Sequence, residues 1–182
     1  MNFSNFVIIR LYLRSTFPKK SNFLGRSVLA SNLSLFLEQA NLPWNKVSSF
    51  EEVESRGILA GAEENGNKVY VGRTHDKDGN FVISKIVPAI KKSFYAFNGI
   101  EEAGIELEIL DNTANCHWVK SDGKPIEDAA VVNEFYIGRA LYNGNIVVGR
   151  VDMKKKELIG TYNGKAFNLP SFDVLIYKSK GI

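Results

Sequence analysis

The sequence predicts an all-β fold, and three observations support this prediction. From Trp44 onward, short segments of alternating apolar and polar residues follow one another. Turn-forming dipeptides such as Asp78-Gly79 and Asn143-Gly144 separate these segments. No long stretch of this region repeats its apolar residues with a helical period. We therefore expect strands joined by tight turns over most of the chain.

The first predicted hairpin occupies residues 67–86, NKVYVGRTHDKDGNFVISKI. Val69 and Val71 would share one face of its first strand, and Phe81 and Ile83 one face of its second. The connecting DKDGN also resembles part of a calcium loop. However, its glycine comes two positions too early, and no glutamate follows at the required spacing. A simple turn is the favoured interpretation.

The second predicted hairpin lies at residues 134–151, EFYIGRALYNGNIVVGRV. Its two strands flank Asn143-Gly144. Asn-Gly suits a type I′ turn, because both central residues of that turn adopt positive φ. Two hairpins with related sequences suggest that the unit itself is repeated.

The two hairpins belong to a tandem duplication. YVGR at 70–73 is followed 66 positions later by YIGR at 136–139. Four further matches share an offset of 65: Gly79 with Gly144, 85–86 with 150–151, 98–99 with 163–164, and 107–110 with 172–175. A constant offset is typical of an internal repeat. We predict a first copy at 41–111 and a second at 116–178, which together form one compact domain.

Each copy contains two hairpins and a closing strand, which is too little to bury both faces of its own sheet. We therefore expect the copies to pack with pseudo-twofold symmetry, as a β-sandwich or as intertwined sheets. Trp44 and Trp118 open the copies but lie 74 positions apart, so the first copy carries extra residues before its hairpin. Gly72 and Gly138 would allow a bulge or a close approach. The arginine that follows each glycine could tie the copies together.

Residues 1–40 are expected to be a poorly ordered extension with a short helix at 33–40. The first 37 residues carry five basic side chains and no acidic one, which resembles a mitochondrial transit peptide. A start site assigned too far upstream is the other interpretation. The rest of the chain has 18 basic and 20 acidic residues, so no general nucleic-acid surface is expected. No apolar run is long enough for a membrane span.

Cysteine and histidine are scarce. Cys116 is the only cysteine, so no intramolecular disulfide can form, and a cytoplasmic location is expected. With His75 and His117 the only histidines, no zinc-ligand pattern is present, and we expect no metal or cofactor. Catalytic motifs are also missing. The adjacent acids at 51–52 and 101–102 would point to opposite faces on a strand, so we expect no enzymatic activity.

The order of the short motifs resembles the DM-nine repeat family. The resemblance extends from Trp44 to Tyr177 and includes both copies. It rests on ILAG (58–61), YVGR (70–73), SKIVP (84–88), NGIE (98–101) and LEIL (107–110), and on YIGR (136–139), VGRV (148–151), NGKA (163–166) and FDVL (172–175). The resemblance implies an all-β, non-enzymatic protein. It also implies mannose-type sugar recognition in innate immunity, or a role in stress response.

The resemblance further implies which residues contact the sugar. In the first copy, the family's acidic residue and lysine fall on Glu63 and Lys85. Glutamate replaces the usual aspartate there, and a serine replaces the glycine before the lysine. In the second copy Arg150 stands for the lysine, and the acidic position falls on Asn133 or Glu134.

The chemistry of these residues is compatible with a sugar site. A carboxylate accepts hydrogen bonds from two vicinal hydroxyls, and an ammonium donates to them. Binding at a shallow site would be weak, so two copies or a homodimer would add avidity. Two alternatives remain open. Glu63 and Lys85 could form an ordinary exposed ion pair between strands, and the chain could be a protein-interaction module without sugar binding.

Overall fold

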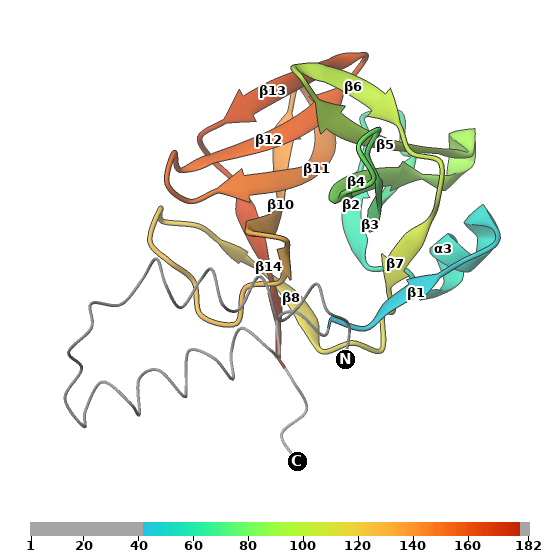
Figure 1. Ribbon diagram of the computed structural model, residues 1–182, viewed down its shortest axis with the longest axis horizontal. Helices are drawn as coiled ribbons and strands as arrows, with labels where there is room; N and C mark the ends of the chain where they lie inside the picture. The colour runs from blue at the N-terminus through green and yellow to red at the C-terminus, as the bar shows by residue number, and fades with distance from the viewer. Residues whose placement is uncertain (1–41, 179–182) are drawn as a thin grey trace. The chain divides into compact units, whose positions relative to one another are not determined.

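The computed structural model describes residues 42–178 (Figure 1). These residues form one large antiparallel sheet of short strands with very little helix. The all-β class and the duplicated architecture are therefore confirmed. The predicted extension at 1–40, including its short helix at 33–40, lies outside the described residues.

Both copies contain the same series of strands. The elements of the first copy are β1 (Trp44–Lys46), α3 (Phe50–Arg56), β2 (Leu59–Ala62), β3 (Lys68–His75), β4 (Phe81–Val87), the 3₁₀ helix η1 (Pro88–Ile90), β5 (Lys92–Phe97), β6 (Ile100–Ala103) and β7 (Glu108–Leu110). Those of the second copy are β8 (Cys116–Lys120), β9 (Val131–Val132), β10 (Phe135–Tyr142), β11 (Asn145–Asp152), β12 (Glu157–Tyr162), β13 (Lys165–Leu169) and β14 (Asp173–Tyr177).

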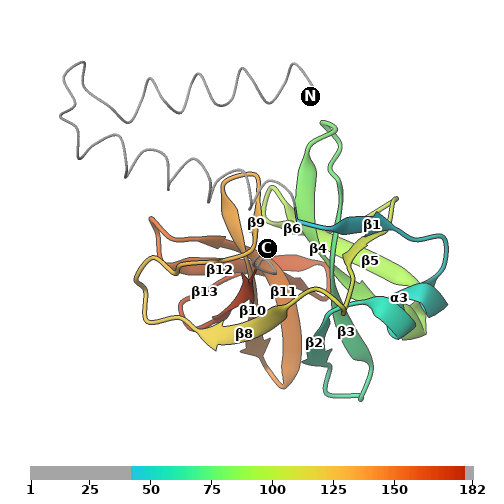
Figure 2. The same cartoon turned by 90° about the horizontal axis from the view of Figure 1, so that it is seen from below.

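The strand order shows the expected pseudo-twofold symmetry. Along the sheet the strands run β1-β7-β3-β4-β5-β6-β13-β12-β11-β10-β14-β8. This order reads the same from both ends when each strand is exchanged for its counterpart in the other copy. The additional strands β2 and β9 pair with the counterparts β3 and β10. The two copies therefore form the two halves that Figure 2 shows from below.

Both predicted hairpins are present. The β10–β11 hairpin turns at Asn143 and Gly144, whose φ angles are 48° and 78°, as a type I′ turn requires. In the β3–β4 hairpin, one carboxylate oxygen of Asp76 accepts hydrogen bonds from the backbone N–H groups of Asp78 and Asn80, at 2.9 and 2.8 Å. This side chain adds to the backbone turn bond from the Gly79 N–H to the Asp76 carbonyl, as aspartate commonly does in turns.

The copies meet edge to edge at β6 and β13, at the top of Figure 1. Only one residue pair, Ile100 with Lys165, is in strand register there. Two further backbone hydrogen bonds flank this pair, from the N–H of Glu101 to the Gly164 carbonyl and from the N–H of Ala166 to the Gly99 carbonyl. The sheet is thus continuous across the join, but only over a short length.

The central core is built from both copies. Its buried apolar side chains come from β2, β3, β4 and β7 of the first copy and from β9, β10, β11 and β14 of the second. Many are repeat counterparts, such as Val71 with Ile137 and Leu110 with Leu175. Each copy also has a smaller core of its own. Since the largest cluster is shared, each copy depends on the other for much of its apolar burial.

The repeated arginine is held in the same way in both copies. Arg73 lies over the Trp44 ring at 4.7 Å and pairs with Glu108 at 2.6 Å. Its counterpart Arg139 lies over the Trp118 ring at 4.6 Å and pairs with an aspartate of β14. These contacts fix β1 on β7 and β8 on β14, so Arg73 acts within its own copy.

The arginine after each glycine was expected to tie the copies together. This expectation is correct for the second arginine, Arg139, and not for Arg73. Arg139 Nη1 donates to the Ala60 carbonyl at 2.8 Å, and Trp118 Nε1 donates to the Leu59 carbonyl at 3.2 Å. The glycine before each arginine reflects close packing: a Cβ on Gly72 would lie 2.4 Å from a side-chain carbon of Ile86.

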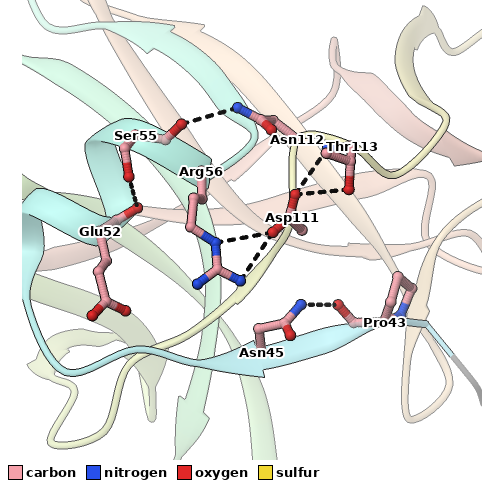
Figure 3. A network of polar contacts seen from close by, with 8 residues as sticks. All are labelled: Pro43, Asn45, Glu52, Ser55, Arg56, Asp111, Asn112 and Thr113. Carbon is pink, nitrogen blue, oxygen red and sulfur yellow. Dashed lines mark hydrogen bonds and ion pairs between the residues drawn. The ribbon is translucent and has the colours of Figure 1, made fainter.

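Helix α3 occupies the stretch in which the first copy has extra residues. It begins at the N-cap Ser49, whose hydroxyl accepts a hydrogen bond from the backbone of Glu52. Its last residue, Arg56, pairs with Asp111 after β7, with Nε and Nη2 both 3.0 Å from one carboxylate oxygen (Figure 3). Asn112 adds a bond from its side chain to the Ser55 carbonyl. Helix α3 is therefore bound to the segment that follows β7, within the first copy.

Candidate functional site

Lys85 is a buried lysine, which is unusual for a residue of this type. It lies on β4, opposite Val71 on one side and Phe94 on the other. Its side chain is only 2% exposed. The ammonium donates a hydrogen bond of 3.2 Å to the backbone carbonyl of Thr161 on β12. A charged side chain on a strand of the first copy therefore contacts a strand of the second copy.

Two carboxylates converge on this ammonium. Glu101 Oε1 lies 3.3 Å from Lys85 Nζ, and Glu63 Oε1 lies 3.7 Å from it. Their side chains are 7% and 10% exposed. Glu63 directly follows β2, and Glu101 is the second residue of β6. We refer to Glu63, Lys85 and Glu101 together as the Lys85 cluster.

The Lys85 cluster lies at the junction between the copies. Two aromatic rings face the ammonium, with centroids at 5.0 Å for Phe94 and 5.4 Å for Tyr162. Phe94 belongs to the first copy and Tyr162 to the second. The backbone N–H of Gly164, also from the second copy, donates to Glu101 Oε2 at 2.8 Å. The site is therefore composite.

Acceptors outnumber donors in the Lys85 cluster. One ammonium faces two carboxylates, which leaves a formal charge of −1 if all three groups are ionised. Glu101 Oε1 is fully buried and accepts no hydrogen bond within residues 42–178. This oxygen is ion-paired with the Lys85 ammonium at 3.3 Å but accepts no hydrogen bond, so it keeps the capacity to accept one from a hydroxyl or from water. The cluster can thus accept hydrogen bonds from a polyhydroxylated ligand.

The structure brings Glu63 and Lys85 together. The alternative of an exposed ion pair between strands is wrong, because their ion pair is buried. Both side chains are buried, at 2% exposed for Lys85 and 10% for Glu63, and the Thr161 carbonyl and the Tyr162 ring of the second copy contact the Lys85 ammonium. The neighbouring Glu102 instead pairs with Lys77 at 2.6 Å. The expectation that Glu101 and Glu102 point in different directions is therefore confirmed.

The second copy lacks an equivalent of this cluster. Arg150, the counterpart of Lys85, is exposed and lies over the Phe135 ring at 4.9 Å. Asn133 donates from its side chain to the Phe81 carbonyl at 2.7 Å. In the described part of the chain no hydrogen bond or ion pair joins Asn133 to Arg150. At the position that corresponds to Glu101, the second copy has Ala166.

Glu101 was missed as a site residue, although strand register contains a signal for it. Lys85 pairs with Phe94, and Phe94 pairs with Ala103. Glu101 is two residues from Ala103, so it shares the face of Lys85. Nothing in the sequence indicates the contributions of the second copy, because they depend on how the two halves pack.

Cys116 provides a separate test of the structure. Burial raises the pKa of its thiol to about 11. Because the thiolate is the reactive form, alkylation at pH 8 should be about 100-fold slower than for a cysteine with a pKa near 9. Rates of reaction with iodoacetamide, measured for the native and the denatured chain, would check this. Equal rates would contradict the burial of the thiol.

Neither a metal centre nor a membrane helix is found in the part of the chain that the structure describes. Between residues 42 and 178, no three or more acidic, cysteine or histidine side chains are grouped as metal ligands would be. In the same range, no helix has the length and apolarity that a membrane crossing needs.

Comparison with known families identifies the module. The family model of the DM9 repeat matches residues 63–133 and again residues 132–181. The two matches together cover more than half of the chain, as tandem copies. This chain belongs to the DM9 repeat family, and the resemblance inferred from its motifs is confirmed.

Two further comparisons are more limited. The search of curated proteins gave no match. Among solved structures, the crystal structure of the nematode sperm cell motility protein MFP2B is similar, with a TM-score of 0.47 and 11% sequence identity. The similarity covers 76% of this chain and 44% of that chain, so the present chain spans less than half the length of that protein.

Proposed function

We propose that this DM9 protein is a non-catalytic lectin that binds mannose-type glycans through the Lys85 cluster. The observation that supports this most directly is the convergence of Glu63 and Glu101 on the Lys85 ammonium. Buried polar groups are normally fully paired, and an excess of acceptors there suggests a site that a ligand completes. The two rings beside the ammonium would offer apolar surface to the carbon face of a sugar.

Binding would exchange partners within the cluster. Lys85 and Glu63 lie 3.7 Å apart, which is a loose ion pair. Two vicinal hydroxyls could donate to the Glu63 carboxylate and accept from the ammonium, replacing this contact with shorter hydrogen bonds. Because Lys85 is almost fully buried, the Glu63 side chain must turn aside to admit the ring. Such an exchange predicts weak binding to a single sugar, and a homodimer would add avidity.

A binding measurement tests this function. A glycan array should show preference for mannose-type glycans, and calorimetry should then give the affinity for methyl α-mannoside. The Glu63→Ala change is expected to cost about 1–3 kcal/mol of binding free energy, which weakens binding roughly 5- to 150-fold.

The neighbouring Glu64→Ala variant provides a matched control, because Glu64 is exposed and is held through its backbone N–H by Asn145. It should bind like the parent. Equal affinities for the parent and the Glu63→Ala variant would place the sugar elsewhere.

A second candidate is a protein-interaction module without sugar binding. The specific observation in its favour is the 2% exposure of Lys85, since a closed cluster can serve simply to join the two copies. This alternative predicts no enrichment of any glycan on the array, together with a stable complex of a partner protein or of two chains. Light scattering after size-exclusion chromatography would measure the assembly.

A further inference from the structure

We infer that the outer edge of β8 is a contact between two copies of this chain, which pair β8 with β8 about a twofold axis. β8 and β1 are the two ends of the strand order, so each has a neighbouring strand on one side only. Within residues 42–178, β8 pairs with β14 alone. An open edge of a sheet presents unpaired backbone groups and is a template for another strand. The inference does not depend on sugar binding.

The backbone groups of β8 that point away from β14 follow from the pairing. Asn115 and Ser121, which flank β8, both bond through their backbone to the residues just after and just before β14. Inward and outward groups alternate along such a strand. The backbone groups of Cys116, Trp118 and Lys120 therefore point outward. Of these groups, the Cys116 N–H alone has a backbone partner in the described chain, a carbonyl two residues earlier.

Antiparallel pairing of two β8 strands about Trp118 would use these groups. Each Trp118 would donate its N–H to the carbonyl of the partner's Trp118. Each Lys120 would donate its N–H to the carbonyl of the partner's Cys116. Lys120 carries the only permanent charge of β8, and it would lie opposite an uncharged residue. Since no like charges meet across the axis, the strand is complementary to a second copy of itself.

Apolar side chains are exposed on both sides of this edge. On one face of β8, Val119 is 38% exposed. On the other face, Trp118 is bonded to the Leu59 carbonyl, and the Leu59 side chain is 47% exposed. In the pair, Val119 would face the partner's His117, and the two Trp118 rings would be neighbours beside Leu59. One contact would therefore cover exposed apolar groups on both faces of the sheet.

The strand at the other end of the sheet is a poorer candidate. β1 has three residues, against five in β8, and it leads directly towards α3. Its last residue, Lys46, is exposed and pairs with Glu106 at 3.0 Å. Pairing of β8 with β1 of another chain would also leave one open edge at each end and continue into a filament. Pairing of β8 with β8 closes after two chains, which favours a dimer.

Light scattering after size-exclusion chromatography of the full chain would test this inference. The mass of the parent should approach that of two chains as the concentration rises. Val119→Glu combined with His117→Glu would place acids opposite one another across the axis and should weaken dimerisation at least about tenfold. Val119→Glu combined with His117→Lys would place a lysine opposite each glutamate and should retain the dimer.

The two double variants control for each other, because they change the same exposed positions and should melt at similar temperatures. Ile105→Glu is a further control, since Ile105 is 93% exposed but lies between β6 and β7. It should dimerise like the parent. A parent that stays a single chain at every concentration would overturn the inference. Equal assembly of the two double variants would show that residues 117 and 119 do not face each other across the axis, and would overturn it as well.

Discussion

Replacement of Lys85 by methionine is expected to lower the free energy of unfolding by about 3–5 kcal/mol, because it leaves two buried carboxylates without their cation. Glu63 and Glu101 are at most 10% exposed, so water can replace little of the lost interaction. Methionine approximates the length of the lysine stem, which limits any cavity. Denaturant unfolding of the parent and the variant would measure the difference.

Two variants make this result specific. Arg150→Met changes the exposed counterpart of Lys85 and is expected to cost less than about 1 kcal/mol. Adding Glu63→Gln and Glu101→Gln to the Lys85→Met chain should restore part of the stability, because neutral amides cost less to bury than unpaired carboxylates. A Lys85→Met chain as stable as the parent would show that the cluster is open to water.

Gly149→Ala is expected to destabilise the fold by about 3 kcal/mol or more, and to lower the melting temperature by roughly 10 °C. Gly149 on β11 lies directly opposite Gly160 on β12. A Cβ on Gly149 would lie 1.9 Å from the backbone oxygen of Ile159, and backbone cannot rotate away as a side chain can. The two strands would have to separate. Differential scanning calorimetry would measure the change.

The first copy supplies the control for this prediction. Ser84 is the counterpart of Gly149, and there strand pairing with β5 begins only at the next residue, Lys85. A side chain is therefore accommodated at position 84, where the strands are not yet in register. Ser84→Ala should change stability by less than about 1 kcal/mol, since the buried hydroxyl has no hydrogen-bond partner in the described residues. A Gly149→Ala chain that melts with the parent would contradict the close approach.

Local sequence patterns were sufficient to predict much of the fold. Turn chemistry at Asn143-Gly144 placed one hairpin, and the constant repeat offset predicted both the duplication and its pseudo-twofold packing. The shortest elements were not predicted individually. Strands such as β9, with two residues, carry no measurable periodicity. Helix α3 was predicted only as an excess of residues, because seven residues are too few for a clear helical pattern.

The candidate site was less accessible to sequence reasoning. Glu63 and Lys85 were named through a family resemblance, and the structure places them together. The burial of these two side chains could not be inferred, because it depends on how the second copy packs against the first. Glu101 lies 16 positions from Lys85 along the chain, and only the pairing of β4, β5 and β6 brings them to one face. The role of Gly164 depends on the join between β6 and β13, which no local pattern specifies.

The symmetrical strand order has a consequence for how such a protein can diverge. Two separate chains with one copy each would join β6 to β6 about a true twofold axis, so that every substitution appeared on both sides of the interface. In this single chain the two sides are independent. Glu101 faces Gly164 on one side of the axis, and Ala166 stands at the related position on the other. A fused dimer can therefore concentrate two negative charges on one side of its axis, which a homodimer of identical chains cannot do.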